Sequence, residues 1–302
     1  MHNKIIKGFT LVEMLVFVTL TILVMTSSYT IYSTIKKESN DRRDDMEAQV
    51  KELTAKGILY NFIKNSGFAC KQGSLDQMYY DRTSDSLDDF FVNSNSIHVG
   101  SLPLPVSDHL SASLETGCTG DCFEVGTDYI MIKKNQSYTQ LVATNSTSNT
   151  VILDSVDGIS VNDYLVLCND SDINLVKATA VVPATNTVSL ALPPCGSTYY
   201  VGDYIGNLSL EILYIRDTGA KDADDNPIYS LYVYIKSGSN RGISHELIRG
   251  INGMHVEYGT VLNDVITWNT VSSRVGINKY DHQALRITFS VNDKSFNKIV
   301  VL

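Results

Sequence analysis

The residues with the clearest chemical potential in this chain lie near its N-terminus, around Gly8, Phe9 and Glu13. Glu13 is the one charged residue in the apolar run from Phe9 to Met25, FTLVEMLVFVTLTILVM. A carboxylate inside a membrane helix costs about 2.5 kcal/mol or more, so it normally has a partner. If the chain is cut after Gly8, the new α-amine of Phe9 lies one helical turn before Glu13 and can neutralise it, in the same chain or in a neighbour. The alternative is a carboxylate near the membrane surface that extends into the headgroups.

The rest of the chain contains no recognised catalytic pattern. It lacks the H-E-x-x-H, nucleophile-elbow, P-loop and dinucleotide-binding signatures. The loop KDADDNP holds Asp222, Asp224 and Asp225, and closely spaced carboxylates suit calcium. The loop has neither the glycine nor the distal glutamate of an EF-hand, which favours a solvated hairpin turn. We therefore expect no enzymatic activity, no metal site and no cofactor. The histidines beyond the apolar run are scattered: His98, His109, His245, His255 and His282.

Five cysteines follow the apolar run, and an exported segment would meet an oxidising compartment where disulfides persist. None of their spacings matches a zinc site. The preferred pairing is Cys168 with Cys195, which brackets a hairpin near residues 174–192. Two of Cys70, Cys118 and Cys122 would form the other bond, and the odd count leaves one thiol over or paired between chains. The sequence leaves this connectivity open.

The bulk composition indicates a folded protein with an acidic surface. The chain has 302 residues, 43% of them apolar, and a formal net charge of −9. This length suffices for one large domain or two small ones. The net negative charge argues against a broad nucleic-acid-binding surface, which requires clustered Lys and Arg.

The apolar run, extended to Tyr32, provides about 24 residues, enough to span a membrane as a helix. Lys4 and Lys7 precede it without any acidic residue, which predicts that this end stays in the cytoplasm and the rest is exported. A secretory signal would instead carry a small-residue cleavage site after the apolar run. Thr26-Ser27-Ser28 is a weak imitation of such a site, but there is no A-x-A pattern.

The helix is expected to continue beyond the membrane to about residue 65. Residues 33–66 are rich in charge, have no proline and only Gly57 as glycine, and keep apolar residues at helical spacing from Met46 onward. The charge run 36–47 is interpreted as a solvated face or neck, with a subunit contact as the alternative. Gly67 is expected to end the helix. The predicted fold is therefore α+β, a long helix with a transmembrane half and an amphipathic half packed on a β-rich head.

Beyond residue 70 the sequence favours strands. Five segments are rich in β-branched and aromatic residues and are separated by turn residues. A faint internal repeat joins Asn149–Leu153 and Val161–Leu165 to Asn186–Leu190 and Val201–Ile205, with a spacing that differs by three residues. Duplication and convergence on common hairpin chemistry explain it equally well. The predicted strands lie at 128–134, 163–168, 208–215, 230–236 and 284–291, with a further short strand at SIHVG, 96–100.

The N-terminal sequence K-G-F-T-L-V-E-M-L resembles the class III signal of type IV pilins and type II secretion pseudopilins. In that family a prepilin peptidase cuts after the glycine, methylates the new N-terminal residue and leaves the helix intact. The resemblance implies processing at Gly8 and Phe9, and docking between subunits through Phe9 and Glu13. It divides the chain into a leader at 1–8, a transmembrane helix at 9–32, its amphipathic continuation at 33–66 and a head at 67–302.

Parts of the head resemble PilW-type minor pilins. In that family a helical turn like ELIRGI precedes a strand like MHVEYG, and a later strand carries a pattern similar to Ala284-Leu285-Arg286-Ile287. The matching segments are 65–70, Asp163–Cys168, 245–259, Trp268 and 282–291.

The PilW-type resemblance implies a minor pilin that primes pilus assembly and sits at the filament tip. Its partners would be the prepilin peptidase, the other minor pilins, the major pilin and the inner membrane, with no nucleic acid. The chain would first cross the inner membrane once with its head in the periplasm, and later belong to the pilus on the cell surface. A type II secretion pseudopilin and a tip adhesin are the alternatives.

Overall fold

The structure is a computed structural model, and it combines one long helix with a β-rich region. Among the residues it describes there are one α-helix, one short 3-10 helix and fifteen strands, so the α+β class is confirmed at this level. Contacts divide the chain into two compact units, residues 1–53 and 54–302. The described residues are 11–67, 78–85, 87, 95–103, 122–238, 242–262, 265–272, 274–277, 281–292 and 294–302.

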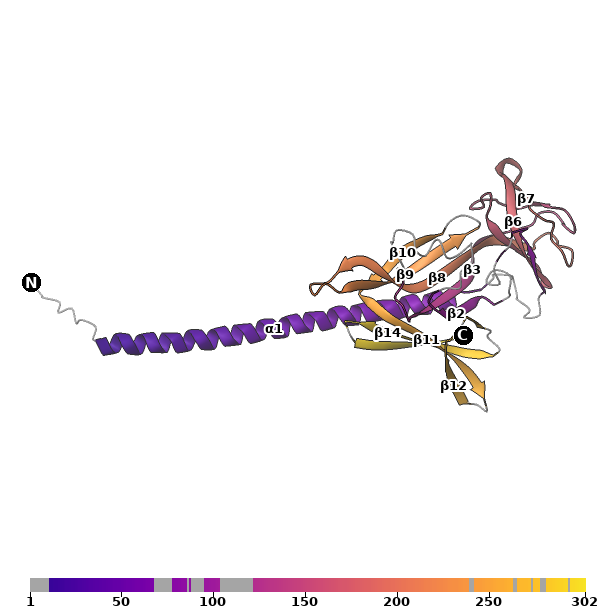
Figure 1. Ribbon diagram of the computed structural model, residues 1–302. Coiled ribbons are helices and arrows are strands. Elements are labelled where there is room, and N and C mark those ends of the chain that lie inside the picture. Colours follow the sequence, from indigo (N-terminus) through magenta and orange to yellow (C-terminus); the bar gives the residue numbers. More distant parts are fainter. Residues whose placement is uncertain are drawn as a thin grey trace, which may run out of the picture. The chain divides into compact units, whose positions relative to one another are not determined.

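Helix α1 runs without interruption from Leu11 to Lys64, as the composition predicts (Figure 1). It contains no proline, and its charged middle part forms pairs one turn apart, such as Glu38 with Arg42 at 2.6 Å. The helix ends at the predicted place, where Gly67 has a φ of +134° that L-residues rarely adopt.

The last turns of α1 belong to the second unit. Leu59 and Ile63 are buried there. The ammonium group of Lys298 lies 5.3 Å from the centre of the Tyr60 ring, a cation–π distance that joins this end of the helix to strand β15.

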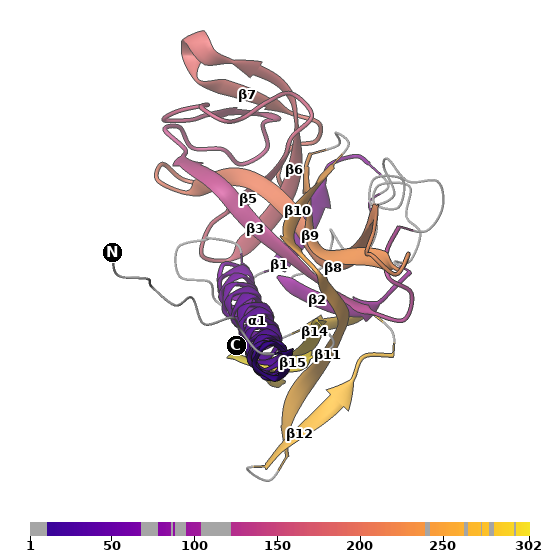
Figure 2. The ribbon, with the colours of Figure 1, turned by 90° about the vertical axis from the view of Figure 1, so that its left-hand side faces the viewer.

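The larger sheet has eleven strands in the described residues. Its main path is β13-β2-β3-β8-β5-β6-β7-β4, with β9 on β8, β10 on β9 and β1 on β6. Figure 2 labels most of these strands, from β2 to β10. Among these described strands only β1 on β6 is a parallel pair. The strands are β1 (Met78–Arg82), β2 (Ile97–Ser101), β3 (Asp128–Gln140), β4 (Thr150–Ile152), β5 (Tyr164–Cys168), β6 (Asp172–Val182), β7 (Thr187–Leu190), β8 (Tyr204–Lys221), β9 (Pro227–Ser237), β10 (Ile243–Arg249) and β13 (Val275–Ile277).

The smaller sheet has four antiparallel strands in the order β12-β11-β14-β15. Strand β14 alternates buried and less buried positions, which is typical of a sheet with one face on a core. The strands are β11 (Ile251–Leu262), β12 (Val265–Thr270), β14 (His282–Val291) and β15 (Lys294–Val301).

Both faces of the larger sheet are covered at β5, all five of whose residues are buried. Successive side chains on a strand point to opposite faces. Tyr164, Val166 and Cys168 accordingly belong to one core cluster, and Leu165 and Leu167 to another. This explains why the strand is a continuous apolar run rather than an alternating one.

The predicted strands are all present, but the expected helical turn at ELIRGI is wrong. Those residues continue strand β10, which pairs with β9, and Gly250, with a φ of +80°, separates it from β11. A bulge between Glu246 and Ile248 lets Glu246 pair with Arg249 at 2.9 Å. An ion pair between residues three apart also forms in a helix. The sequence alone therefore does not distinguish a helical turn from a bulged strand at these residues.

The internal repeat corresponds to an approximate two-fold relation in the larger sheet. Strand β4 of the first copy pairs antiparallel with β7 of the second, with Val151 opposite Val188. Each copy also donates one backbone hydrogen bond to the other beside this pair of strands. The amide of Leu153 donates to the carbonyl of Asn186 at 2.9 Å, and the amide of Leu190 donates to that of Asn149 at 2.6 Å.

The two copies also share the turn that leads into their next strand. In Ser160–Asp163 and Tyr200–Asp203, the aspartate carboxylate accepts a hydrogen bond from the first residue's amide, at 2.8 and 2.7 Å. The third residue, Asn162 or Gly202, has positive φ in each turn. These turns lead into β5 in the first copy and β8 in the second. The two strands pair antiparallel with each other, as expected for strands related by the approximate two-fold axis.

Candidate functional site

The predicted processing and docking residues lie partly outside the described part of the chain. Gly8 and Phe9 are not described, so cleavage between them stays a prediction. Glu13 is described, in the first turn of α1. It is exposed within its own unit, as are the apolar side chains that follow it.

Threonine hydroxyl groups in the apolar part of α1 donate hydrogen bonds to backbone carbonyls of the preceding turn. Thr19 donates to the carbonyl of Leu15 at 3.1 Å, and Thr21 to that of Phe17 at 2.7 Å. Such bonds direct the hydroxyl donors back onto the helix, which suits a lipid environment. By length and composition α1 is a candidate membrane span, and a signal sequence at this position would meet the same criteria.

The preferred disulfide between Cys168 and Cys195 is wrong. Cys195 carries a free thiol, whereas Cys122 and Cys168 are each disulfide-bonded. Cys70 and Cys118, the other candidates, lie outside the described residues.

The alternation of side chains along β5 explains this correction. Cys168 lies in the cluster on one face of the sheet. Asn174 of β6 pairs with Leu167, whose side chain belongs to the opposite face. The Asn174 amide holds the backbone of Cys195 through two hydrogen bonds of 2.9 Å. Cys195 therefore lies over the face away from Cys168.

The C-terminal residues selected from the sequence come together on the smaller sheet. The Arg286 guanidinium contacts the Glu257 carboxylate at 2.5 Å and lies 4.6 Å from the centre of the Trp268 ring. The hydrogen bond from Arg286, together with its positive charge, lowers the pKa of Glu257. Gly259 leaves room for the side chains of β12, because a Cβ atom there would lie 2.9 Å from Ile266 and 3.3 Å from the Trp268 ring. This arrangement joins β11, β12 and β14, and its contacts are structural.

The acidic loop is organised as a turn between β8 and β9. Both carboxylate oxygens of Asp222 accept hydrogen bonds, from the amides of Asp224 and Asn226 and from the Asn226 side chain. Lys221 pairs with Asp225 at 2.8 Å. The bonds to Asp222 hold the turn closed, and those from Asn226, with a smaller contribution from Asp224, lower the pKa of Asp222.

In the larger sheet, the side chain of Asp85 occupies a polar site formed by Tyr164 and Lys177, which we call the filled site. Asp85 follows strand β1, which runs parallel to β6. Its carboxylate accepts a hydrogen bond from the Tyr164 hydroxyl at 2.7 Å and pairs with the Lys177 ammonium at 3.0 Å. Burial, together with this bond to Asp85, raises the pKa of Tyr164.

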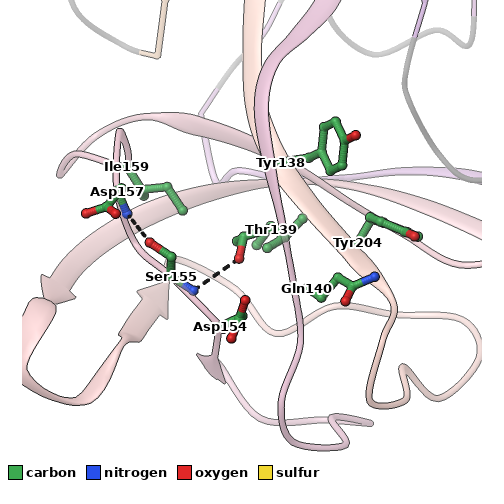
Figure 3. A pocket seen from close by; sticks show the side chains of 9 residues that line it. Tyr138, Thr139, Gln140, Asp154, Ser155, Asp157, Ile159 and Tyr204 are labelled. Carbon is green, nitrogen blue, oxygen red and sulfur yellow. Dashed lines mark hydrogen bonds between the residues drawn. The ribbon is translucent and has the colours of Figure 1, made fainter.

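The approximate two-fold relation maps this site, on β5 and β6, onto β8 and β3. At that position on β8 and β3 the structure has a pocket. Gln140 pairs with Tyr204 there, as Lys177 pairs with Tyr164 in the filled site. The pocket has a volume of about 420 Å³ and is lined by residues that include Tyr138, Gln140, Asp154, Asp157 and Tyr204 (Figure 3).

The segment that carries the two pocket carboxylates is fixed to the sheet. The amide of Ser155 donates to the Thr139 hydroxyl at 3.1 Å, and the amide of Asp157 donates to the Ser155 hydroxyl at 3.0 Å (Figure 3). The buried Asn207 side chain donates to the carbonyl of Gly158. Sequence reasoning missed this pocket, because its residues come from three separate segments that only the strand pairing brings together.

Comparison of the chain with known protein families, with curated proteins and with solved structures finds no match. The resemblance to pilins therefore rests on the residues themselves. The fold is compatible with it, since one long apolar helix precedes a large β-rich region.

Proposed function

We propose that this chain is a type IV pilin-like protein, and within that class a minor pilin of the PilW type that primes pilus assembly. It would be made with the leader 1–8, cross the inner membrane once through the first half of α1, and hold its head in the periplasm. After processing it would enter the filament and reach the cell surface at the tip. The role is non-enzymatic.

The observation that carries this proposal is the N-terminal pattern together with the helix that follows it. A positively charged leader, Gly8, Phe9 and Glu13 precede an uninterrupted helix that is apolar in its first half and charged in its middle. The helix leads into a β-rich unit instead of ending after the membrane, as a cleaved secretory signal would.

Docking between subunits would use the Phe9 amine and the Glu13 carboxylate. In lipid, an unpaired charge is costly, so a carboxylate at this depth favours any neighbour that presents an amine. The prepilin peptidase, the other minor pilins and the major pilin are the partners that this mechanism requires.

A pseudopilin of type II secretion would share the whole N-terminal pattern. The PilW-type assignment is favoured by the C-terminal segments, where Glu257, Trp268 and Arg286 form one cluster.

Substitution of Gly8 by Ala tests the processing step. We expect Gly8→Ala to keep residues 1–8, which an intact-mass measurement on the membrane-extracted protein would reveal. Gly57→Ala is the matched control, because Gly57 lies inside α1 with no atom within 4 Å of an added Cβ, and it should be processed normally. A Gly8→Ala protein with the same mature mass as the natural chain contradicts cleavage at this bond.

A further inference from the structure

We propose that strand β12 pairs along its outer edge with the same strand of a second copy of this chain, antiparallel and about a two-fold axis at Thr267. Strand β12 is an end strand of the smaller sheet, whose order is β12-β11-β14-β15 (Figure 2). This interface goes beyond the proposed function and does not depend on it.

The exposure of β12 indicates that its outer edge is open. Val265, Ile266 and Thr267 are consecutive, so their side chains point to both faces of the strand, and all three are exposed. Val265 is 64% exposed and Ile266 46%, with the whole chain around them. A segment lying along this edge would cover such side chains. Among the described residues, the hydrogen bonds of β12 run to β11 or stay within β12.

The hairpin of β11 and β12 extends further than the strand beside it. Strand β14 accompanies β11 only as far as the pair Thr260–His282, whereas β11 and β12 stay paired up to Leu262–Val265. In the described residues the end of the hairpin is therefore a two-stranded ribbon, and such ribbons are marginally stable on their own. A further strand on β12 would stabilise it.

Strand β12 also lacks the features by which edge strands avoid pairing, which are short length, charged side chains, proline and bulges. Of the other described edge strands, β4 and β13 have three residues each, β10 has a bulge and charged residues, and β1 and β15 carry charged residues. The β12 sequence, VITWNT, has no charge and no proline, and its register with β11 is unbroken. Among these edges it is the one best suited to pairing.

The register with β11 determines which backbone groups β12 offers. Leu262 and Val265 are paired with only two residues between them, so they form a hydrogen-bonded pair that closes the hairpin. Hydrogen-bonded pairs alternate with non-bonded ones along an antiparallel ladder. The amide and carbonyl groups of Ile266, Trp268 and Thr270 therefore point away from β11, towards the outer edge.

A two-fold axis at Thr267 makes this edge complementary to itself. Ile266 of each copy then exchanges backbone hydrogen bonds with Trp268 of the other. Ile266 lies opposite an aromatic side chain and Thr267 opposite the Thr267 of the second copy, and both kinds of cross-strand pair stabilise sheets. Because β12 is uncharged, no like charges meet along the paired strands. The contact uses the same surface on both copies, so it closes at a dimer.

Cysteine cross-linking of the full-length chain in detergent tests the register. Thr267→Cys is made in a Cys195→Ser background, which removes the free thiol of Cys195. The two introduced thiols lie on Cα atoms about 4.5 Å apart across the axis, within disulfide range, so mild oxidation should link most chains into dimers. Val265→Cys is the matched control on the same exposed strand. It lies about 13 Å from its counterpart in this register and should link at least about tenfold less.

Charge exchange at the same position provides the decisive comparison. Thr267→Lys places two ammonium groups opposite each other, and Thr267→Glu two carboxylates, so each should weaken self-association about tenfold in sedimentation equilibrium. An equimolar mixture of the two variants should associate again, because an ammonium group then faces a carboxylate. Thr267 is exposed, so these changes leave the fold intact. Ser295→Lys, an exposed position on β15 at the opposite end of the sheet, is the control and should change nothing.

Three outcomes would overturn the proposal. The first is a full-length chain that stays monomeric at a concentration on the order of 100 μM. The second is self-association that neither charged variant weakens, which would assign it to α1 in the detergent micelle. The third is equal cross-linking of Thr267→Cys and Val265→Cys, which would show that the contact has no defined register.

Discussion

Glu13 is the residue on which the docking proposal depends, because its carboxylate lies in the apolar part of α1. We expect Glu13→Ala to be processed normally but to enter filaments poorly, since it cannot pair with the Phe9 amine of a neighbour. Immunoblots of sheared filaments and of membranes measure the incorporated fraction. Glu38→Ala, which removes an exposed helical ion pair, is the control. Normal incorporation of the Glu13 variant would remove the charge-pairing argument.

Arg286 carries a second prediction at this scale. Arg286→Met removes the ion pair with Glu257 and the contact with the Trp268 ring, so the urea midpoint at pH 7 should fall. Trp268 is the single tryptophan of the chain, and its fluorescence reports on this sheet directly.

The pH dependence of that effect follows from the lowered pKa of Glu257. A carboxyl whose folded pKa lies below its unfolded value adds stability above the unfolded pKa, and this stability is lost as the pH falls through the folded one. The difference between the natural chain and Arg286→Met should therefore be smaller at about pH 3 than at pH 7, because protonation of Glu257 removes its ion pair with Arg286 in the natural chain. An equal difference at both pH values would show that the ring contact, not the ion pair, carries the effect.

The cysteines show where residue-level prediction from sequence reaches its limit. Spacing alone made Cys168 and Cys195 a plausible pair around a hairpin. The side chain of Cys168 points to one face of the sheet, and the backbone of Cys195 is held by Asn174 on the other. Which face a cysteine occupies depends on strand register, which local sequence does not specify.

At the scale of elements, the helix and the main strands follow from composition and periodicity. The strand pairing does not, because it joins segments far apart in the chain. The parallel pair of β1 and β6 brings residues near 80 beside residues near 174, and the pair of β4 and β7 joins the two copies of the repeat. The filled site results from the pair of β1 and β6, and the pocket lies on the pair of β3 and β8.

The repeated turn gives a prediction at this scale. Asp163→Ala should lower the free energy of unfolding by about 1–2 kcal/mol, because the Ser160 amide loses its hydrogen bond to the buried Asp163 carboxylate. Asp203→Ala should cost less, since Asp203 is less buried than Asp163. Urea titration of the full-length chain measures both, with Asp224→Ala as the control. Equal stability of Asp163→Ala and the control would mean that the carboxylate does not hold the turn.

At the scale of the whole molecule, the chain combines an apolar helix that suits a membrane with a β-rich unit large enough to hold a core on both faces of one sheet. A priming subunit needs both parts, one to wait in the membrane and pack with other pilin helices, the other to present a head.

Deletion of the gene tests the central proposal most directly, with surface filaments counted and protein secretion assayed in the same strain. A minor pilin that primes assembly predicts loss of filaments with secretion intact, and restoration of filaments by the natural gene. Intact filaments with failed secretion would contradict the PilW-type assignment and identify the chain as a secretion pseudopilin.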